Sequence, residues 1–262
     1  MNIRNFYWLI IVVLSGALLF EWTSEKKLES IESHMMLAES MNQIGLGKNH
    51  VAVENEELFI VVSIESGSII EARLKKHPVE KVVGSLGFRV FGSDSVFNYY
   101  FKSGFTGSNP SFELLDAGEG YVVLADKTSG ITKTISLSDT DYEISVLDSV
   151  NEGIQGKSYA GLYRTSGRPL DLKQDALSGG MMNNGSFLGI AISTDSEPYE
   201  TIKLNQVDKE GGVEALSRSG WIAFVQKYFF AALLGSDENI YNFYALPSEG
   251  GLYRMGYTVE NS

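Results

Sequence analysis

Residues 219–245, "SGWIAFVQKYFFAALLGSDENIYNFYA", hold much of the aromatic side-chain area of the chain in one short stretch. In a helical conformation one apolar face would hold Trp221, Phe224, Val225, Tyr228, Phe229 and Ala232, with Gln226 and Lys227 opposite. The run 227–234 is short and apolar and is followed by the turn residues of "GSDEN", which is typical of a strand. We therefore predict a helical turn over residues 221–226 and then a strand. The stretch is too short, and too interrupted by Gln226 and Lys227, to span a bilayer, so we predict that it lies in the protein core.

From residue 51 onward the chain consists of short β-prone runs separated by Gly, Ser, Asn and Asp. These runs are "ELFIVVSI", "SIIEARLKK", "YVVLAD", "ITKTISLS", "YEISVLDSV", "SFLGIAIST", "ETIKLNQV", "IYNFYAL" and "GLYRMGYTV". They follow one another too closely for helical crossovers between parallel strands. The pattern predicts an all-β fold, an antiparallel sandwich over residues 51–262.

The N-terminal segment has a different character. Residues 6–20 carry no charge, and Trp8 and Trp22 lie near the two ends of this run. Arg4 and the amino terminus precede the run, so the positive-inside rule predicts a cytoplasmic N-terminus and a remainder that crosses the membrane. We expect a single transmembrane anchor within residues 1–22, with a cleaved signal peptide as the alternative.

A polar segment separates this anchor from the β-rich body. Residues 23–50 are polar and helix-prone, and Gly45 and Gly47 interrupt the segment near its end. We predict that it forms a helical stalk between the membrane and the folded domain.

The composition limits the classes of function. The formal net charge is −12, which argues against nucleic-acid partners because such a surface repels phosphate backbones. The chain has no cysteine, which excludes disulfides, thiolate metal sites and cysteine nucleophiles. None of the three histidines has a metal-ligand spacing. We predict neither a metal site nor a cofactor.

Several motifs resemble catalytic or binding sequences only in part. The stretch "IGLGKNH" lacks the hydroxyl residue that a phosphate loop needs after its lysine. The acidic stretch "LSDTDYE" lacks the glycine and the late glutamate of a calcium loop. A Ser–His–Asp site would need His50 or His77 and has no nucleophile elbow, and a Ser–Lys pair is numerically possible in any chain of this size. We therefore predict that the protein is not an enzyme.

The glycine-rich stretch "FKSGFTGSNP" (101–110) is predicted to be a long connection between strands. A functional interpretation remains open, in which the stretch forms the rim of a binding groove. The candidate rim residues are Ser103, Gly104, Phe105, Thr106 and Gly107.

The order of anchor, stalk and β domain, together with the aromatic stretch, resembles the YidC family of membrane-protein insertases. The residues that carry this resemblance are Gly220, Trp221, Gln226, Tyr228, Phe229, Asn242, Phe243 and Tyr244. Weaker similarity comes from residues 103–107, from "ITKTISLSDTDYEISV" and from the Pro198–Tyr199 pair before a strand.

The resemblance implies a fold and a role. It implies a β-supersandwich (similar to galactose mutarotase) in the periplasm, tethered to the bacterial inner membrane by the N-terminal span. It also implies help in inserting and folding inner-membrane proteins with or beside the Sec translocon, by protein contact without catalysis. Translocon subunits and nascent membrane proteins are then the expected partners, and the aromatic stretch is expected to serve in the core or in an interaction.

Two alternatives come from other classes of function. The first is a periplasmic carbohydrate-binding or mutarotase-like domain, because the implied fold is similar to that of sugar mutarotases. The second is an anchored structural or scaffold protein.

Overall fold

The computed structural model of the chain describes residues 47–77, 87–150, 156–166, 188–226 and 229–260. Contacts divide the chain into the units Met1–Gly47 and Lys48–Ser262, and every described residue except Gly47 belongs to the second. The predicted anchor and most of the predicted stalk lie outside the described residues. No helix in the described part is both long and apolar enough to cross a membrane.

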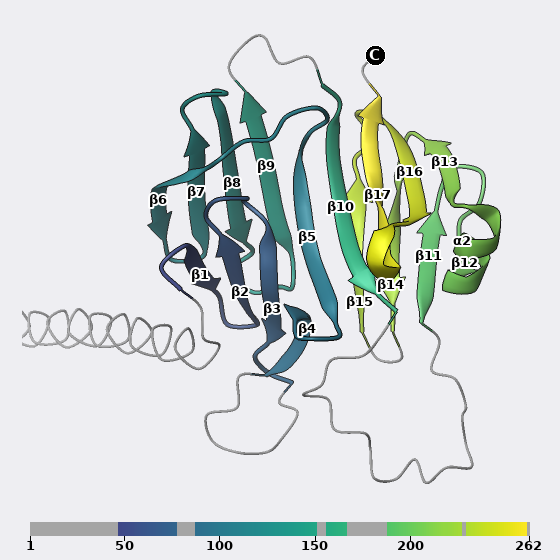
Figure 1. Cartoon of the computed structure of the whole chain (residues 1–262), viewed down its shortest axis with the longest axis horizontal. Coiled ribbons are helices and arrows are strands. Elements are labelled where there is room, and N and C mark those ends of the chain that lie inside the picture. The colour runs from purple at the N-terminus through teal and green to yellow at the C-terminus, as the bar shows by residue number, and fades with distance from the viewer. Residues whose placement is uncertain (1–46, 78–86, 151–155, 167–187, 227–228, 261–262) are drawn as a thin grey trace, which may run out of the picture. The chain divides into compact units, whose positions relative to one another are not determined.

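The described strands form three sheets (Figure 1). The nine-stranded sheet has the spatial order β1 (His50–Glu54), β2 (Leu58–Ser63), β3 (Ile69–Leu74), β4 (Phe88–Ser93), β5 (Asn98–Phe105), β10 (Ser158–Thr165), β17 (Leu252–Glu260), β16 (Ile240–Pro247), β13 (Val213–Ser217). A four-stranded sheet has the order β12 (Glu200–Lys203), β11 (Gly189–Ser193), β14 (Gly220–Val225), β15 (Phe230–Gly235). Another has the order β6 (Glu113–Gly118), β7 (Tyr121–Asp126), β8 (Ile131–Leu137), β9 (Ile144–Val150).

All of these strand pairings are antiparallel, as predicted. The predicted runs form strands because their side chains alternate between the core and the solvent. In β8, "ITKTISL", every second residue is buried. The all-β prediction is therefore confirmed.

One of the predicted strands is shorter than expected. The strand in "ETIKLNQV" ends at Lys203, and helix α2 (Leu204–Glu210) follows it. Leu204 and Val207 are buried three residues apart, which is a helical spacing, and Gly211 ends the helix in a left-handed conformation with φ 71°. The strand prediction overlooked this spacing and the glycine that follows it. A short 3₁₀ helix, η1 (Glu249–Gly251), lies between β16 and β17.

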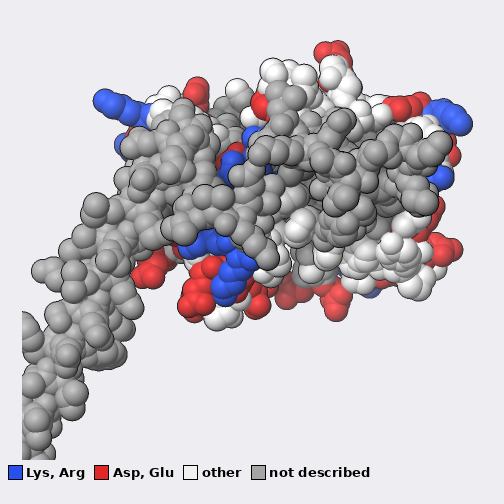
Figure 2. All heavy atoms as spheres, turned by 90° about the horizontal axis from the view of Figure 1, so that it is seen from below, with Lys and Arg blue, Asp and Glu red and all other residues white. Residues whose placement is uncertain are grey.

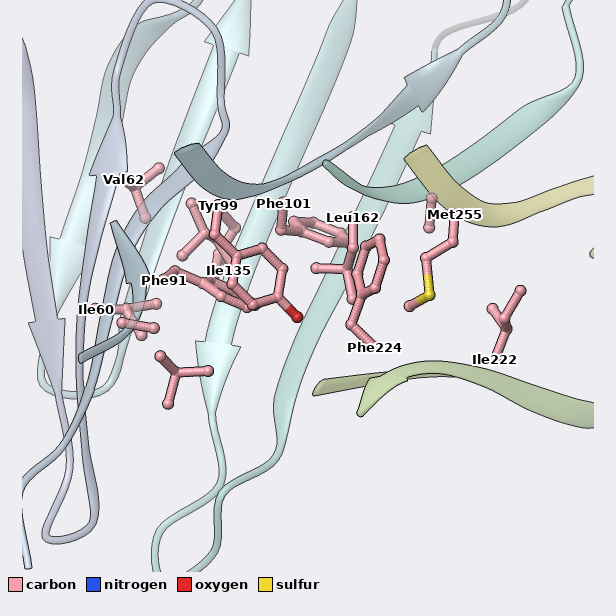
Figure 3. Packing of buried hydrophobic residues seen from close by; sticks show 14 of the residues in the cluster. Ile60, Val62, Phe91, Tyr99, Phe101, Ile135, Leu162, Ile222, Phe224 and Met255 are labelled. Carbon is pink, nitrogen blue, oxygen red and sulfur yellow. The ribbon is translucent and has the colours of Figure 1, made fainter. Parts of the chain in front are cut away.

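One hydrophobic core lies between the nine-stranded sheet and the two smaller sheets (Figure 3). Ile60 of β2, Ile135 of β8 and Phe224 of β14 belong to the same buried cluster. Tyr99 of β5 meets Phe224 edge to face, with ring centroids 5.8 Å apart. Figure 1 shows β14 and β15 behind β10 and β17. The described domain is thus an antiparallel sandwich.

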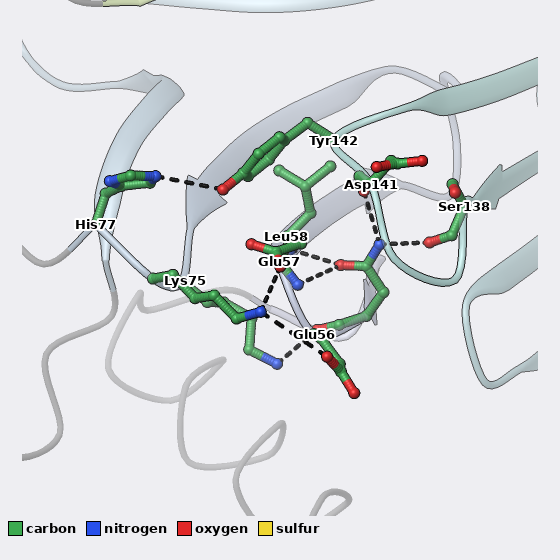
Figure 4. Close-up of polar contacts among 10 residues, drawn as sticks. Glu56, Glu57, Leu58, Lys75, His77, Ser138, Asp141 and Tyr142 are labelled. Carbon is green, nitrogen blue, oxygen red and sulfur yellow. Dashed lines mark hydrogen bonds and ion pairs between the residues drawn. The ribbon is translucent and has the colours of Figure 1, made fainter.

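A polar residue joins two of the sheets at the start of β2 (Figure 4). The Asn55 side-chain amide donates to the carbonyl oxygens of Ser138 and, at 3.1 Å, Asp141, which lie in the β8–β9 connection. The side-chain oxygen of Asn55, Oδ1, accepts from the backbone N–H groups of Glu57 and Leu58. One side chain therefore shapes the turn before β2 and ties it to a distant turn.

The surface reflects the acidic composition. On the face seen in Figure 2, carboxylates (red) lie at many places around the margin of the domain, whereas lysine and arginine (blue) occupy a few separate places. Places where cations gather without carboxylates are therefore informative about partners.

Candidate functional site

The aromatic stretch begins with a hairpin of β14 and β15. Gly220 pairs with Gly235 at its open end and Val225 with Phe230 near its turn, where the Gln226 N–H donates to the Phe229 carbonyl at 2.8 Å. The predicted helical turn over 221–226 is therefore wrong. Three consecutive residues, 222–224, are buried, and this hides the alternation that marks a strand. The strand predicted after it exists, but it begins at Phe230; Lys227 and Tyr228 lie outside the described residues.

Gly220 occupies a position that only glycine fits. Its φ is 121°, and a Cβ there would overlap the carbonyl oxygen of Ser193 on the neighbouring strand. The glycine lets β14 start close against β11.

The hairpin has one side in the core and one side that is apolar but exposed. Trp221, Phe230 and Leu234 lie on the outward side, and Trp221 pairs with Leu234. Phe230 is 68% exposed and Leu234 71% exposed, while Trp221 is half-buried. Tyr199, 62% exposed, lies beside Trp221 with ring centroids 6.2 Å apart. We call these four residues the outer hairpin face. The prediction that the whole stretch 219–245 is core is wrong for Trp221, Phe230 and Leu234.

The open side of β15 adds to this surface. Within the described part of the chain, β15 pairs only with β14, so its other edge has unpaired backbone N–H and C=O groups. Charged residues and proline usually protect an edge strand from pairing with another chain. The sequence of β15, "FAALLG", contains neither. An exposed apolar edge of this kind is suited to contact with another protein.

Phe229 belongs to a different contact. Its ring stacks on Phe88 with centroids 4.2 Å apart and meets His77 edge to face at 6.0 Å. His77 Nε2 lies 3.3 Å from the Tyr142 hydroxyl (Figure 4). Phe229 therefore connects the hairpin turn to the nine-stranded sheet and has a structural role.

Asn242, Phe243 and Tyr244, the last three residues that carry the resemblance, lie on β16, and their side chains alternate between the two faces of the sheet. Phe243 is fully buried, with the Tyr257 ring edge to face at 6.0 Å. Asn242 and Tyr244 point to the outer face of the nine-stranded sheet, where the Asn242 amide donates to Glu214 at 3.3 Å. The structure thus divides the resembling residues between two sheets and between core and surface.

The candidate rim residues lie partly in a strand. Ser103, Gly104 and Phe105 end β5, so the prediction of a loop is wrong for them, and only Thr106 and Gly107 lie in the turn that follows. The strand was overlooked because its glycine and serine suggest a loop, although Tyr99, Phe101 and Ser103 alternate toward the core. The rim residues Ser103, Gly104 and Phe105 line a hollow of about 190 Å³, together with Glu65, Ser66, Lys102, Ser108, Asn109, Pro110, Ser111 and Tyr159.

Ser103 takes part in a buried ionic network. Lys133 is fully buried, and its Nζ lies 2.7 Å from an Asp148 carboxylate oxygen. The ammonium group also donates to the Ser103 hydroxyl (2.6 Å) and carbonyl (3.1 Å), and the hydroxyl donates to Asp148. Burial lowers the pKa of Lys133, and the charge of Asp148 opposes this effect. In a Ser–Lys nucleophile a neutral lysine accepts the proton of the serine hydroxyl. Here the Ser103 hydroxyl donates its proton to Asp148 and accepts from the lysine, so the arrangement is different.

Lys133 and Asp148 were missed at the sequence level, although a signal was present. In "ITKTISL" the lysine lies between Ile131 and Ile135 on the side of the strand that faces the core. A charged residue in an inward position requires a buried partner, but nothing local identifies that partner.

The described residues contain no group of three or more His, Cys, Asp or Glu side chains arranged to hold a metal ion. The acidic residues of "LSDTDYE", Asp139, Asp141 and Glu143, are exposed in the connection between β8 and β9.

Comparison with known proteins identifies the family. The family model for the YidC periplasmic domain matches residues 50–262, the β domain described above. The chain belongs to the YidC family. It is 26% identical over 240 residues to the membrane protein insertase YidC of Pseudomonas putida (strain GB-1) and 25% identical over 230 residues to that of Hahella chejuensis.

The alignments with these YidC proteins cover most of this chain but less than half of each relative. It covers 82% of this chain and 41% of the Pseudomonas putida protein, and 79% of this chain and 40% of the Hahella chejuensis protein. The chain thus spans about two-fifths of the length of the YidC relatives that it matches. The matched part is a periplasmic domain, in agreement with the expectation drawn from the aromatic stretch.

Proposed function

We propose that this chain is the membrane-anchored periplasmic part of a YidC-type insertase, which assists the insertion and folding of inner-membrane proteins. In this proposal residues 1–22 hold the sandwich, a β-supersandwich, at the outer surface of the inner membrane. The domain meets a Sec translocon subunit or an emerging segment of a nascent membrane protein through non-covalent contact. The family match over residues 50–262 supports the assignment.

The observation that carries the proposal is the outer hairpin face. Large apolar side chains on a surface favour burial in an interface, and about 25 cal/mol per Å² is gained when their area leaves water. Trp221, Phe230 and Leu234 extend across two neighbouring strands and end at the open edge of β15. A partner that covers this face removes exposed apolar area and can also pair with the free edge.

The buried network argues against a Ser–Lys nucleophile at Ser103. The Ser103 hydroxyl accepts from the Lys133 ammonium and donates to Asp148, so Lys133 does not accept its proton as in a Ser–Lys site. Labelling of Ser103 by a serine-reactive fluorophosphonate probe would contradict this interpretation.

The hairpin proposal is tested by crosslinking in membranes. With a photo-crosslinking residue in place of Phe230, we expect adducts with a translocon subunit or a nascent chain. The substitution Leu234→Lys should abolish these adducts with little effect on folding, because Leu234 is exposed. The matched control is Leu147→Lys on β9, where the leucine is 65% exposed, and it should leave the adducts unchanged. Equal adducts in the two lysine variants would show that the hairpin face is not the contact.

A further inference from the structure

A second surface lies on the opposite side of the sandwich, on the outer face of the nine-stranded sheet. Ala160 and Leu162 of β10 point into the core, so Tyr159, Gly161 and Tyr163 point outward. The strand registers place these residues beside outward residues of β5, β17 and β16. This face is turned toward the viewer in Figure 1, where β14 and β15 lie behind the strands.

The outward residues form what we call the tyrosine face, which consists of Tyr100, Lys102, Tyr159, Gly161, Tyr163, Tyr244, Arg254 and Gly256. Tyr163 lies between Tyr100 and Arg254, and Gly161 lies between Lys102 and Gly256. Tyr244 is opposite Gly256 on the next strand. Residues from four strands are thus neighbours on one surface.

Two glycines form the floor of this face. A Cβ at Gly256 would overlap the carbonyl oxygen of Ala160, so the strands approach closely there. A Cβ at Gly161 would lie 3.1 Å from the Tyr244 hydroxyl and 3.3 Å from the Tyr163 ring, so both tyrosines lie over the glycine. The Tyr163 and Tyr100 rings are parallel, with an interplanar angle of 1° and centroids 4.9 Å apart. The neighbouring rings therefore hold each other in place before any ligand arrives.

The tyrosine hydroxyls are available to a ligand. Tyr159, Tyr163 and Tyr244 are half-buried, yet in the described part of the chain none of their hydroxyls forms a hydrogen bond. Burial raises the pKa of Tyr159 to about 12 and also raises that of Tyr163, so these phenols keep their protons at neutral pH. Several donors on one partly dry surface suit a ligand that offers several oxygen acceptors.

Two cations, Lys102 and Arg254, belong to this face of a chain whose net charge is negative. Lys102 of β5 lies beside Gly161, Arg254 of β17 lies beside Tyr163, and no ion pair among the described residues involves either cation. The chain carries a formal net charge of −12, so a carboxylate-bearing ligand is repelled at most other places. Two carboxylates border this face: Glu214, which is opposite Tyr244 on β13 and accepts from Asn242, and Glu65, which lines the hollow beside Lys102.

From this arrangement we propose that the tyrosine face binds an extended acidic polypeptide segment. The backbone carbonyls of such a segment accept from the tyrosine hydroxyls, its flat peptide groups and side chains pack on the rings, and its carboxylates pair with Lys102 and Arg254. The inference rests on the proposed function, which supplies the ligand: translocated loops of membrane proteins are poor in Lys and Arg, so they bring few positive charges for Lys102 and Arg254 to repel. The hollow beside Lys102, Gly104 and Tyr159 continues the face beyond β5.

The test uses the full chain in detergent and two synthetic peptides labelled with a neutral dye. One peptide alternates Asp with Ser and Tyr, and the other has Lys in place of every Asp. By fluorescence anisotropy we expect the acidic peptide to bind and the lysine peptide not to bind. Arg254→Gln and Lys102→Gln should each weaken binding by about five-fold or more, and added salt should do the same. Tyr244→Phe, which removes only a hydroxyl, should also weaken it.

The control is Lys209→Gln on the exposed end of α2, which removes the same charge elsewhere and should leave binding unchanged. Equal binding of both peptides, or unchanged binding by the Lys102→Gln/Arg254→Gln double variant, would overturn the inference. So would binding of a neutral oligosaccharide without binding of the acidic peptide. None of these results depends on the hairpin crosslinks, so the failure of one proposal can be told from the failure of the other.

Discussion

At the scale of single residues, Gly220 shows how one position can hold two strands together. The start of β14 approaches β11 so closely that no side chain fits between them. We expect Gly220→Ala to lower the free energy of unfolding by about 2–3 kcal/mol, since both the positive φ and the contact with the Ser193 carbonyl are unfavourable. Urea denaturation of the variant measures this loss.

Gly211 provides the matched control for this prediction. Its φ of 71° is also unfavourable for alanine, but a Cβ there would meet nothing within 4 Å. Gly211→Ala should therefore lower the free energy of unfolding by about 1 kcal/mol, the cost of the left-handed backbone conformation alone. Equal losses in the two variants would mean that the close approach of β14 to β11 contributes nothing.

At the scale of elements, the two turns joined by Asn55 offer the clearest test. Asn55→Asp retains the oxygen that accepts from Glu57 and Leu58, but it loses the amide that donates to the β8–β9 connection. We expect a loss of about 1–2 kcal/mol of unfolding free energy, because two carbonyls lose their donor and face a carboxylate instead. Chemical denaturation measures the effect.

Asn55→Ala removes both sets of bonds and should cost more, about 2–4 kcal/mol. If Asn55→Asp were as stable as the unchanged protein, the bonds between the turns would not matter, and only the local turn would depend on this residue.

At the scale of the whole molecule, partly buried tyrosines should set the alkaline limit of stability. Burial raises the pKa of Tyr159, Tyr253 and Tyr257 to about 12, against about 10 in an unfolded chain. Between these values the unfolded chain releases protons that the folded domain retains, so the free energy of unfolding falls as pH rises. Lys133 and Tyr241 act in the opposite direction, because their pKa values are lowered on folding, but they are two groups against several.

We therefore expect the free energy of unfolding to fall by more than about 1 kcal/mol between pH 10 and 11. Urea denaturation at each pH measures this change, and absorbance of tyrosinate reports which state ionises. Tyr257→Phe should make the decline less steep. A free energy that stayed constant or rose over this range would contradict the expected sign.

The sequence by itself determined the all-β class, most strand positions and the family. These depend on local patterns: alternation of side chains, spacing of turn residues, and short identities such as Gly220–Trp221. The same patterns failed where the burial of consecutive residues hid the alternation, as at 222–224, and where glycines suggested a loop, as in β5. They also could not show which part of the aromatic stretch is surface.

Only the tertiary structure decided which residues meet. Lys133 finds Asp148 and Ser103 on other strands, and the tyrosine face gathers Tyr100, Tyr163 and Tyr244 from three strands far apart in the chain. The physical reason is that a strand encodes its own two faces but not its neighbour or its register. Strand order and register follow from how all three sheets bury one core, and the two candidate surfaces exist only as a result of that packing.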